Sequence, residues 1–307
     1  MGPLSGSVRE LVSRGFVRRR EEGVHEILSL VSERYRDVAY SLIPKEWRSN
    51  LHRGIAEALR RRSRRQSGSF AEVIASHLLS GGQVGEAYPM LLVAAQSTLR
   101  SGKLQAASLL LDKADRAREL GEDAMDTVAA IRCRRRLYSL RGQVLHQGDR
   151  PKEALEAWKI ALASAREEGD AESVARAQAG LGLSRVVLGD VAAAAAGLEQ
   201  SLARLPQGDP MWTEAAEALA RTRLAQGDAG GAERLWMELL DLGREMGEGE
   251  VFAQAKAGLG LIALVKGQTN RGRDELDNAV YRMRDQANQK RLPTCLFRLS
   301  ELAHAEG

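Results

Sequence analysis

The pentapeptide Ala-Gly-Leu-Gly-Leu occurs twice in this chain, at residues 179–183 and at residues 257–261. Seven residues after the last glycine of each copy stands another glycine that breaks the helix, Gly189 or Gly267. A glycine inside a helix costs about 1 kcal/mol relative to alanine, so a packing requirement must keep Gly182 in place. Two helices that cross closely at a residue without a side chain meet that requirement. The motif therefore predicts closely crossed pairs of helices.

The same helix pair can be followed along most of the chain. The positions at which two helices are expected to cross are separated by 47, 40, 38, 40 and 40 residues; they are Ala95, Gly142, Gly182, Ala220, Gly260 and Ser300. The last of them belongs to a half-copy that starts at Leu292. A nearly fixed period of this length is the signature of stacked helical repeats.

The order of small and bulky residues in 175–206 resembles the tetratricopeptide repeat. This segment has Leu181-Gly182 in its first helix, Gly189-Asp190 at the turn, alanine and leucine in its second helix, and Pro206 at its end. Residues 88–307 carry about five and a half such copies, whose length of about 40 residues is similar to the longer variants of the family. The resemblance implies an all-α fold in which helix pairs stack into an α–α superhelix.

Composition agrees with an array of interlocking helices. Hydrophobic residues make up 44% of the 307 residues and aromatic residues only 4%, which suits close packing of small side chains. Cys133 and Cys295 form no spaced pair, so we expect reduced thiols in a cytoplasmic protein. Residues 1–15 lack the apolar core of a signal peptide. No apolar run approaches the roughly 20 residues of a membrane span, so no membrane partner is expected.

The charge is concentrated at the N-terminus. Residues 1–67 hold 15 Lys or Arg against 8 Asp or Glu, whereas the remaining 240 residues hold 30 against 33. A surface for nucleic acid would therefore belong to residues 1–67. The arginine runs there, Arg18–Arg20 and Arg60–Arg65, lack interleaved aromatic residues, which argues against nucleic acid as the main partner.

Residues 1–45 are expected to form a small winged-helix-like α/β piece. Residues 16–20 and 24–28 flank a turn and predict a β-hairpin. Helices are expected at 4–14 and 32–43. Helix, hairpin and helix in this order are what the end of a winged helix would contain.

Residues 46–87 are expected to connect this piece to the repeats. Apolar side chains recur at helical spacing along one face of residues 46–62; they are Trp47, Leu51, Ile55, Ala58 and Leu59. Residues 60–68 are interpreted as a basic, Ser-rich linker, and helices at 70–79 and 84–99 begin the array.

Four segments in this part resemble large bacterial signalling ATPases of the STAND class, which include LuxR-type regulators and multidomain kinases and cyclases. They are RGFVRRR at 14–20, YRDVAYSLIP at 35–44, WRSNLHRGIAEAL at 47–59 and AEVIASHLL at 71–79. The resemblance covers about residues 10–120 and implies that a P-loop ATPase and a winged helix precede the repeats. Ser32 stands where relatives usually have histidine, so no nucleotide contact is expected from its helix.

Residues with catalytic chemistry are scattered. The sole Gly-Lys pair, Gly102-Lys103, is followed by leucine, where a phosphate-binding loop requires Ser or Thr. None of the five histidines has a partner at metal-ligand spacing, and His52 and His77 are interpreted as helix-packing residues. We therefore expect a non-catalytic chain without cofactor or metal.

The first helix of each pair should line the concave side of the superhelix. By their offset from the crossing position, the residues expected on this concave face are Arg136, Ser139, Gln143, His146, Arg176, Leu183, Val186, Glu217, Arg221, Gln254, Leu261 and Leu264. One end is polar and partly basic, and the other, which also includes Val265, is apolar.

The face suggests an interaction and sensing scaffold of a bacterial signalling or transcription regulator. Its groove would bind a peptide or partner helix that combines an acidic part with an apolar anchor, and the chain's own upstream ATPase domain is one such partner. Two alternatives stay open, a small-molecule effector site in the groove and a nucleic-acid-binding module in residues 1–67. The apolar end could equally serve to pack the next repeat.

Overall fold

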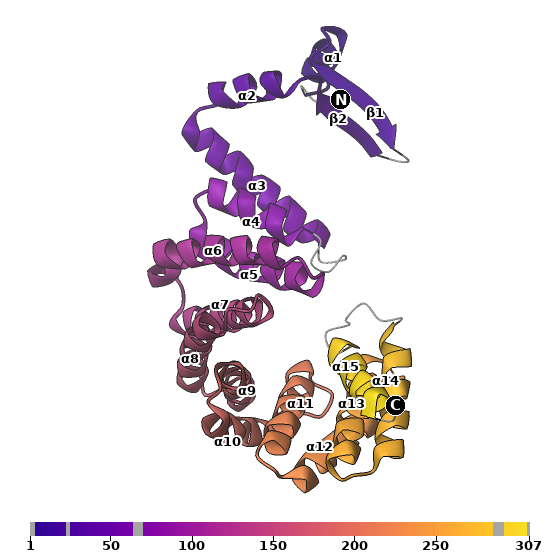
Figure 1. Ribbon diagram of the computed structural model, residues 1–307. Coiled ribbons are helices and arrows are strands. Elements are labelled where there is room, and N and C mark those ends of the chain that lie inside the picture. The colour runs from indigo at the N-terminus through magenta and orange to yellow at the C-terminus, as the bar shows by residue number, and fades with distance from the viewer. Residues whose placement is uncertain (1–3, 23–24, 64–69, 248, 285–291, 306–307) are drawn as a thin grey trace. The chain divides into compact units, whose positions relative to one another are not determined.

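The computed structural model describes residues 4–22, 25–63, 70–247, 249–284 and 292–305. The chain divides into two compact units, Met1–Met90 and Leu91–Gly307. Helices dominate the described residues of both units, and the two short strands lie near the N-terminus (Figure 1). The expected all-α class is confirmed.

The first unit begins with a helix and a hairpin. Its elements are α1 (Leu4–Ser13), β1 (Val17–Glu22), β2 (His25–Leu30), α2 (Glu33–Leu42), α3 (Lys45–Ser63), α4 (Ala71–Ser80) and the first part of α5 (Val84–Arg100). The strands are antiparallel, with Val17 opposite Leu30 and Arg19 opposite Leu28. The expected helix, hairpin and helix are all present, and Ser32 caps α2 by accepting a hydrogen bond from the backbone N–H of Arg34.

Helices α3 and α4 share a small core. Ala56 of α3 is buried with Ile74 and Leu78 of α4. The predicted linker at 60–68 is partly wrong, because α3 continues through Ser63; residues 64–68 lie outside the described part of the chain. Helix continuation has a physical reason, since arginines in the last turn of a helix interact favourably with its dipole.

The second unit is a series of helices joined by short turns. After α5 come α6 (Leu104–Gly121), the short 3₁₀ helix η1 (Glu122–Ala124), α7 (Thr127–Gln147), α8 (Pro151–Glu168), α9 (Ala171–Leu188), α10 (Val191–Leu202), α11 (Pro210–Ala225), α12 (Ala229–Glu245), α13 (Glu250–Val265), α14 (Thr269–Arg284) and α15 (Leu292–Ala305). The turns use glycine where the backbone is left-handed, as at Gly189 with φ 82°. Aspartate side chains cap the helices that follow, as Asp170 does for α9.

The predicted helix crossings are present within the pairs. A Cβ on Gly182 would lie 2.7 Å from the side chain of Leu198 in α10, and one on Gly260 would lie 2.9 Å from Leu276 in α14. Ala220 is fully buried. No crossing is observed at Ser300, which is exposed among the described residues of α15.

A second set of glycines packs against tryptophan from the preceding pair. A Cβ on Gly180 would overlap the indole of Trp158 in α8, and one on Gly258 would overlap the indole of Trp236 in α12. Trp158 also lies against Gly142 of its own pair, where a Cβ would be 2.6 Å from the ring. The two glycines of each pentapeptide therefore have different roles, one packing within a pair and one packing between pairs.

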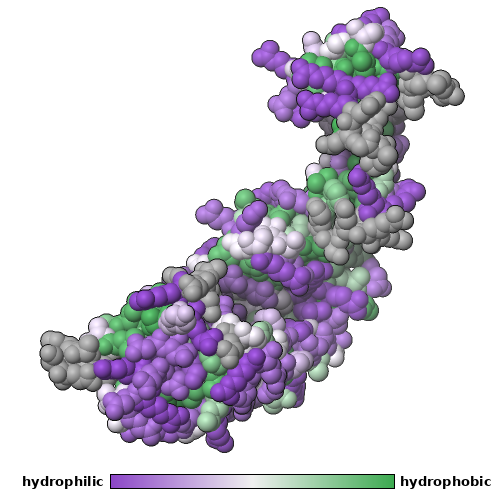
Figure 2. All heavy atoms as spheres, turned by 90° about the vertical axis from the view of Figure 1, so that its right-hand side faces the viewer, coloured by the Kyte–Doolittle hydropathy of each residue, from purple (hydrophilic) through white to green (hydrophobic). Residues whose placement is uncertain are grey.

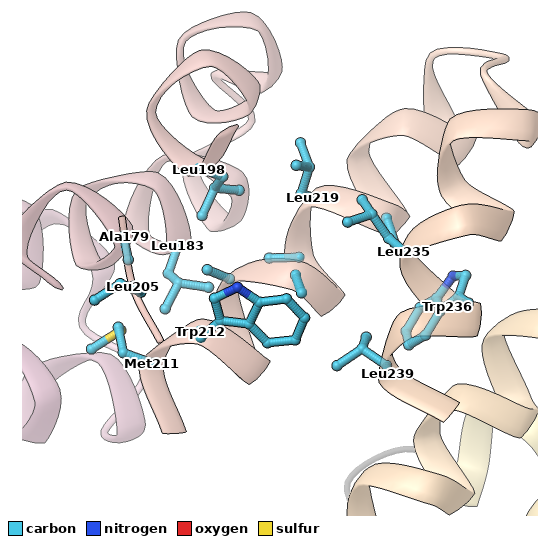
Figure 3. Packing of buried hydrophobic residues seen from close by; sticks show 14 of the residues in the cluster. Ala179, Leu183, Leu198, Leu205, Met211, Trp212, Leu219, Leu235, Trp236 and Leu239 are labelled. Carbon is cyan, nitrogen blue, oxygen red and sulfur yellow. The ribbon is translucent and has the colours of Figure 1, made fainter. Parts of the chain in front are cut away.

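The largest buried cluster extends across several pairs. Figure 3 shows Trp212 of α11 and Trp236 of α12 among aliphatic side chains such as Leu183 of α9 and Leu198 of α10. On the outside, hydrophilic side chains cover most of the surface seen in Figure 2, with smaller hydrophobic patches between them. Neighbouring pairs from α8 to α13 thus share one cluster, and residues of α13, α14 and α15 such as Ala257, Leu276 and Cys295 form a separate one.

Candidate binding face of the repeats

The first helices of successive pairs contact one another. Helix α7 contacts α9, α9 contacts α11, and α11 contacts α13. These four helices form one layer, and α8, α10 and α12 lie on its outer side in Figure 1. Side chains at matching offsets from the crossing positions therefore lie in register on one surface, here called the inner face.

Arg136 marks the basic part of the inner face. Its neighbours Arg132 and Arg135 both bind Glu168 of α8, at 2.9 and 2.6 Å, and so hold a helix pair together. Arg136 instead donates a hydrogen bond to the side-chain oxygen of Gln96 in α5 at 2.6 Å. The positive charge on α7 is thus divided between structural ion pairs and one arginine on the inner face.

Burial and neighbouring charges act on the guanidinium of Arg136. Desolvation of the guanidinium lowers the pKa of Arg136, and the nearby cations Arg135 and Arg100 lower it further. An anionic group on a partner would relieve this electrostatic repulsion. Gln96 and Arg100, which come from α5, were missed by the sequence reasoning because it began the face at α7; the offset rule applied to Ala95 would have found Gln96.

Arg176 has a structural role that the sequence did not reveal. Its guanidinium binds Asp209 at 2.8 Å and also pairs with Glu172. Asp209 caps α11 by accepting a hydrogen bond from the backbone N–H of Met211. Desolvation acts to lower the pKa of Arg176, but the hydrogen bond and charge of Asp209 outweigh it and the pKa is raised. Arg176 therefore fastens α9 to the start of α11.

Two leucines predicted for the binding face pack against other helices of the array. Leu183 is buried at 8% exposure within the large core cluster, because α9 lies between its neighbours. The side chain of Leu264 fills the space beside Gly272 in α14, where a Cβ would overlap it. The assignment of Leu183 to the binding face is therefore corrected, whereas Leu264 is half-buried. Val186 is half-buried against the same core cluster as Leu183.

Two exposed apolar side chains lie at the ends of first helices. Val187 is 53% exposed at the end of α9, and Val265 is 65% exposed at the end of α13. Both stand five residues after a crossing glycine, so the repeat register could have identified Val187, which the sequence reasoning omitted. Leu261 is half-buried on α13.

The other predicted residues of the face differ in accessibility. Arg221 is exposed, whereas the remaining ones are half-buried: Ser139, Gln143, His146, Glu217 and Gln254. Gln254 donates a hydrogen bond to Glu250 on its own helix at 2.9 Å. The predicted residues on α7 and α11 are thus polar, and exposed apolar side chains lie at the ends of α9 and α13.

The interpretation of His52 and His77 as packing residues is supported. Their Nδ1 atoms lie 2.7 Å apart and join α3 to α4, and Nε2 of His52 lies 2.9 Å from the hydroxyl of Tyr40. Burial and the neighbouring His52 lower the pKa of His77. A hydrogen bond between two Nδ1 atoms requires one of them to be unprotonated, so the contact excludes two imidazolium rings.

Within the described ranges, no group of three or more His, Cys, Asp or Glu side chains is placed to hold a metal ion. No helix in the described part of the chain is both long and apolar enough to cross a membrane.

Comparison with known proteins gives matches in structure. No protein-family model and no curated protein matches the chain. A STAND protein with a tetratricopeptide repeat sensor from Pyrococcus horikoshii is similar over 97% of this chain, at 10% identity and TM-score 0.52. The fold is a tetratricopeptide-like superhelix.

Two other structures are similar over smaller parts. BtubC (BKLC) from P. vanneervenii matches 77% of this chain and 90% of its own, at 17% identity and TM-score 0.51. The nearly identical TPR-like repeats of a kinesin light chain from Podosopora anserina match 64% of this chain and 96% of their own, at 18% identity and TM-score 0.46. The present chain spans about half (51%) of the Pyrococcus protein.

Proposed function

We propose that the second unit is a non-catalytic interaction scaffold whose inner face binds a peptide or partner helix. The observation that supports the proposal is the contact of α7 with α9, of α9 with α11 and of α11 with α13. Matching offsets along these helices would bring a polar segment and accessible apolar side chains onto one surface. A bound segment would place an acidic group near Arg136 and an apolar side chain near Val187 or Val265.

The acidic preference rests on how arginines are used along the array. Arg135 and Arg176 have carboxylate partners at short distance, whereas Arg136 donates to the neutral amide of Gln96 and lies near other cations. A carboxylate that replaced Gln96 as acceptor would form a stronger, charge-assisted hydrogen bond. The peptide would therefore be oriented by its acidic end.

We propose further that the chain is the sensor part of a larger signalling regulator of the STAND class. Similarity to the Pyrococcus protein includes the region before the repeats, since it extends over 97% of this chain. The residues of 1–45 would then be the end of a winged helix, and an upstream ATPase domain would be one partner of the chain. Nucleotide hydrolysis by the full-length protein, changed by occupation of the inner face, would be the corresponding activity.

The binding proposal can be tested with synthetic peptides that join an acidic half to a leucine-rich half. Fluorescence anisotropy with the full chain would measure their affinity. Arg136→Glu is expected to weaken binding about tenfold or more, since a hydrogen bond to a charged group contributes about 1.5–3 kcal/mol. Arg234→Glu on the outer helix α12 is the matched control and should leave affinity unchanged. Circular dichroism would verify that both variants keep their helix content.

Arg176 is unsuitable for this test because its ion pair with Asp209 holds two helices together. Equal peptide affinity for the parent chain and Arg136→Glu would contradict the proposal. Salt-dependent binding of a DNA duplex without peptide binding would instead support the nucleic-acid alternative for residues 1–67. Thermal stabilisation by a metabolite, again without peptide binding, would support the effector alternative.

A further inference from the structure

Helix α3 has two opposite faces, and one of them has no covering element among the described residues. Ala56 is fully buried against α4, and Arg53 donates a hydrogen bond to the carbonyl of Gly81 at 2.8 Å. At about 100° per residue, the opposite side of the helix holds a contiguous set of residues, here called the α3 stripe. Its members are Trp47, Asn50, Leu51, Gly54, Ile55 and Ala58.

The large side chains of the α3 stripe are exposed to an extent unusual for their type. Trp47 is 69% exposed, Leu51 53% and Ile55 42%. Tryptophan is highly buried on average, and exposed apolar side chains that adjoin one another mark interaction sites more often than isolated ones do. The α3 stripe is such a contiguous surface.

Gly54 indicates what kind of surface would cover the stripe. It lies in the interior of α3, where glycine is about 1 kcal/mol less favourable than alanine. A Cβ on Gly142, Gly182 or Gly260 would meet a side chain of another helix, so those glycines permit close crossings. For Gly54, no described atom lies within 4 Å of that position. Ala58, one turn further on, is also small and exposed. Together they lower the centre of the stripe, beside Trp47, Leu51 and Ile55, where a second helix could cross closely.

Positive charges border the α3 stripe. Arg61 and Arg62 are exposed and lie on either side of the stripe near the end of α3. Helix α3 as a whole has six Lys or Arg against two Glu, with Arg61 also in an ion pair with Glu57 at 3.4 Å. A second copy of this helix would bring like charges together, whereas a partner with acidic flanks would be attracted.

We infer that the α3 stripe is a docking site for an acidic amphipathic helix of a partner protein. The partner helix would lay leucine-like side chains against Trp47, Leu51 and Ile55. It would cross α3 most closely at Gly54 and place Asp or Glu beside Arg61 and Arg62. This site belongs to the first unit and is independent of the inner face of the repeats.

A lipid surface is the main competing occupant, because basic amphipathic helices with tryptophan also bind anionic membranes. The position of Gly54 distinguishes the two. A membrane gains from a larger apolar residue at the centre of the stripe, whereas a crossing helix is excluded by one. Nucleic acid would use the arginines and gain little from Leu51 and Ile55.

The test uses the full chain and a synthetic amphipathic peptide with leucines at helical spacing and glutamates on both flanks. Trp47 provides the signal, because the other three tryptophans, Trp158, Trp212 and Trp236, are 1–3% exposed. Binding of the peptide is expected to shift the emission of Trp47 to shorter wavelength and to protect it from acrylamide. The same peptide with lysine in place of glutamate should bind about tenfold more weakly, because like charges then face each other.

Two variants decide the geometry. Gly54→Leu should abolish protection of Trp47 while the fold keeps or gains stability, because the new side chain enters open space. Leu109→Asp, at an exposed apolar position of α6, is the matched control and should bind the peptide like the parent chain. The inference would be overturned if the glutamate peptide left Trp47 unprotected, or if Gly54→Leu bound the peptide as the parent chain does. Protection of Trp47 by phosphatidylserine vesicles or a DNA duplex in place of the peptide would also overturn it, as would protection by self-association of the chain alone.

Discussion

Helices α3 and α9 have similar lengths, 19 and 18 residues, and both contain glycine in their interiors, but their surroundings differ. In α9, side chains of α8 and α10 pack against Gly180 and Gly182, and Leu181 between them is buried. In α3, Gly54 meets open space, and Trp47 and Leu51 are exposed. A glycine within a helix therefore contacts a neighbouring helix in α9, whereas no described residue packs against the one in α3.

A glycine within a helix indicates whether another element packs closely against that helix. Its unfavourable propensity is offset only if another element approaches at that point. Where the structure shows that element, as for Gly182, the glycine is part of the fold. Where the position is open, as for Gly54, the glycine is better explained by an association that forms outside the chain.

The largest contrast is expected between two tryptophans. Trp158 lies between Gly142 and Gly180 at 2% exposure, so Trp158→Ala should lower the free energy of unfolding by about 3–5 kcal/mol. Trp47→Ala removes an exposed ring and should change it by less than about 0.5 kcal/mol. Urea denaturation of both variants would measure the difference. Equal losses would show that α3 is covered within the chain.

Glycine substitutions give the next largest effect. Gly182→Leu must displace Leu198 and should cost about 1–3 kcal/mol of unfolding free energy. Gly54→Leu should be neutral or stabilise the chain by up to about 1 kcal/mol, since leucine is the better helix former. Thermal melts of the two variants would decide. An unaltered melt for Gly182→Leu would show that α9 and α10 cross elsewhere.

Helix caps should give a smaller contrast that depends on pH. The hydroxyl and backbone N–H of Ser173 donate to Asp170 and lower its pKa. Since the folded pKa lies below the unfolded value of about 3.9, the cap stabilises fully above that pH and is lost as pH falls through the folded value. Asp170→Asn should remove this dependence, and Asp170→Ala should cost about 1 kcal/mol at neutral pH.

The matched variant is Ser32→Ala, which removes the exposed cap of α2. It should cost less than Asp170→Ala, because the hydroxyl it removes is uncharged and solvated. The loss should also be the same at about pH 3 and about pH 7, because a serine hydroxyl does not titrate in the range where carboxyl groups do. Urea titrations at several pH values would test both. A pH-independent loss for Asp170→Ala would contradict the assigned cap.

Much of the fold could be predicted because small residues at fixed spacing allow few packings. Gly182 and Gly260 alone indicate the crossings, and the hairpin follows from a local alternation. The role of Gly180 was missed because its partner, Trp158, belongs to the preceding pair and lies 22 residues away. Ser300 has the predicted spacing, but it is exposed among the described residues.

The candidate sites were predicted less completely, because accessibility depends on neighbours that are distant in sequence. Leu183 has the correct offset for the inner face but is buried by adjacent helices. Arg176 reads as a surface cation until Asp209, 33 residues later, is placed beside it. The amphipathic pattern of α3 was visible, but the sequence could not show which of its faces α4 would cover.

The tryptophan contacts between pairs also restrict how such a chain can change its length. Trp158 and Trp236 recur 78 residues apart, as do Gly180 and Gly258 that accept them, while the intervening positions hold Leu198 and Ala218. Bulky and compact junctions thus alternate, so the smallest unit that could be duplicated without mismatch is two consecutive repeats. Deleting a single repeat would place a tryptophan indole against an alanine, or a leucine against a glycine, where it would leave unfilled space.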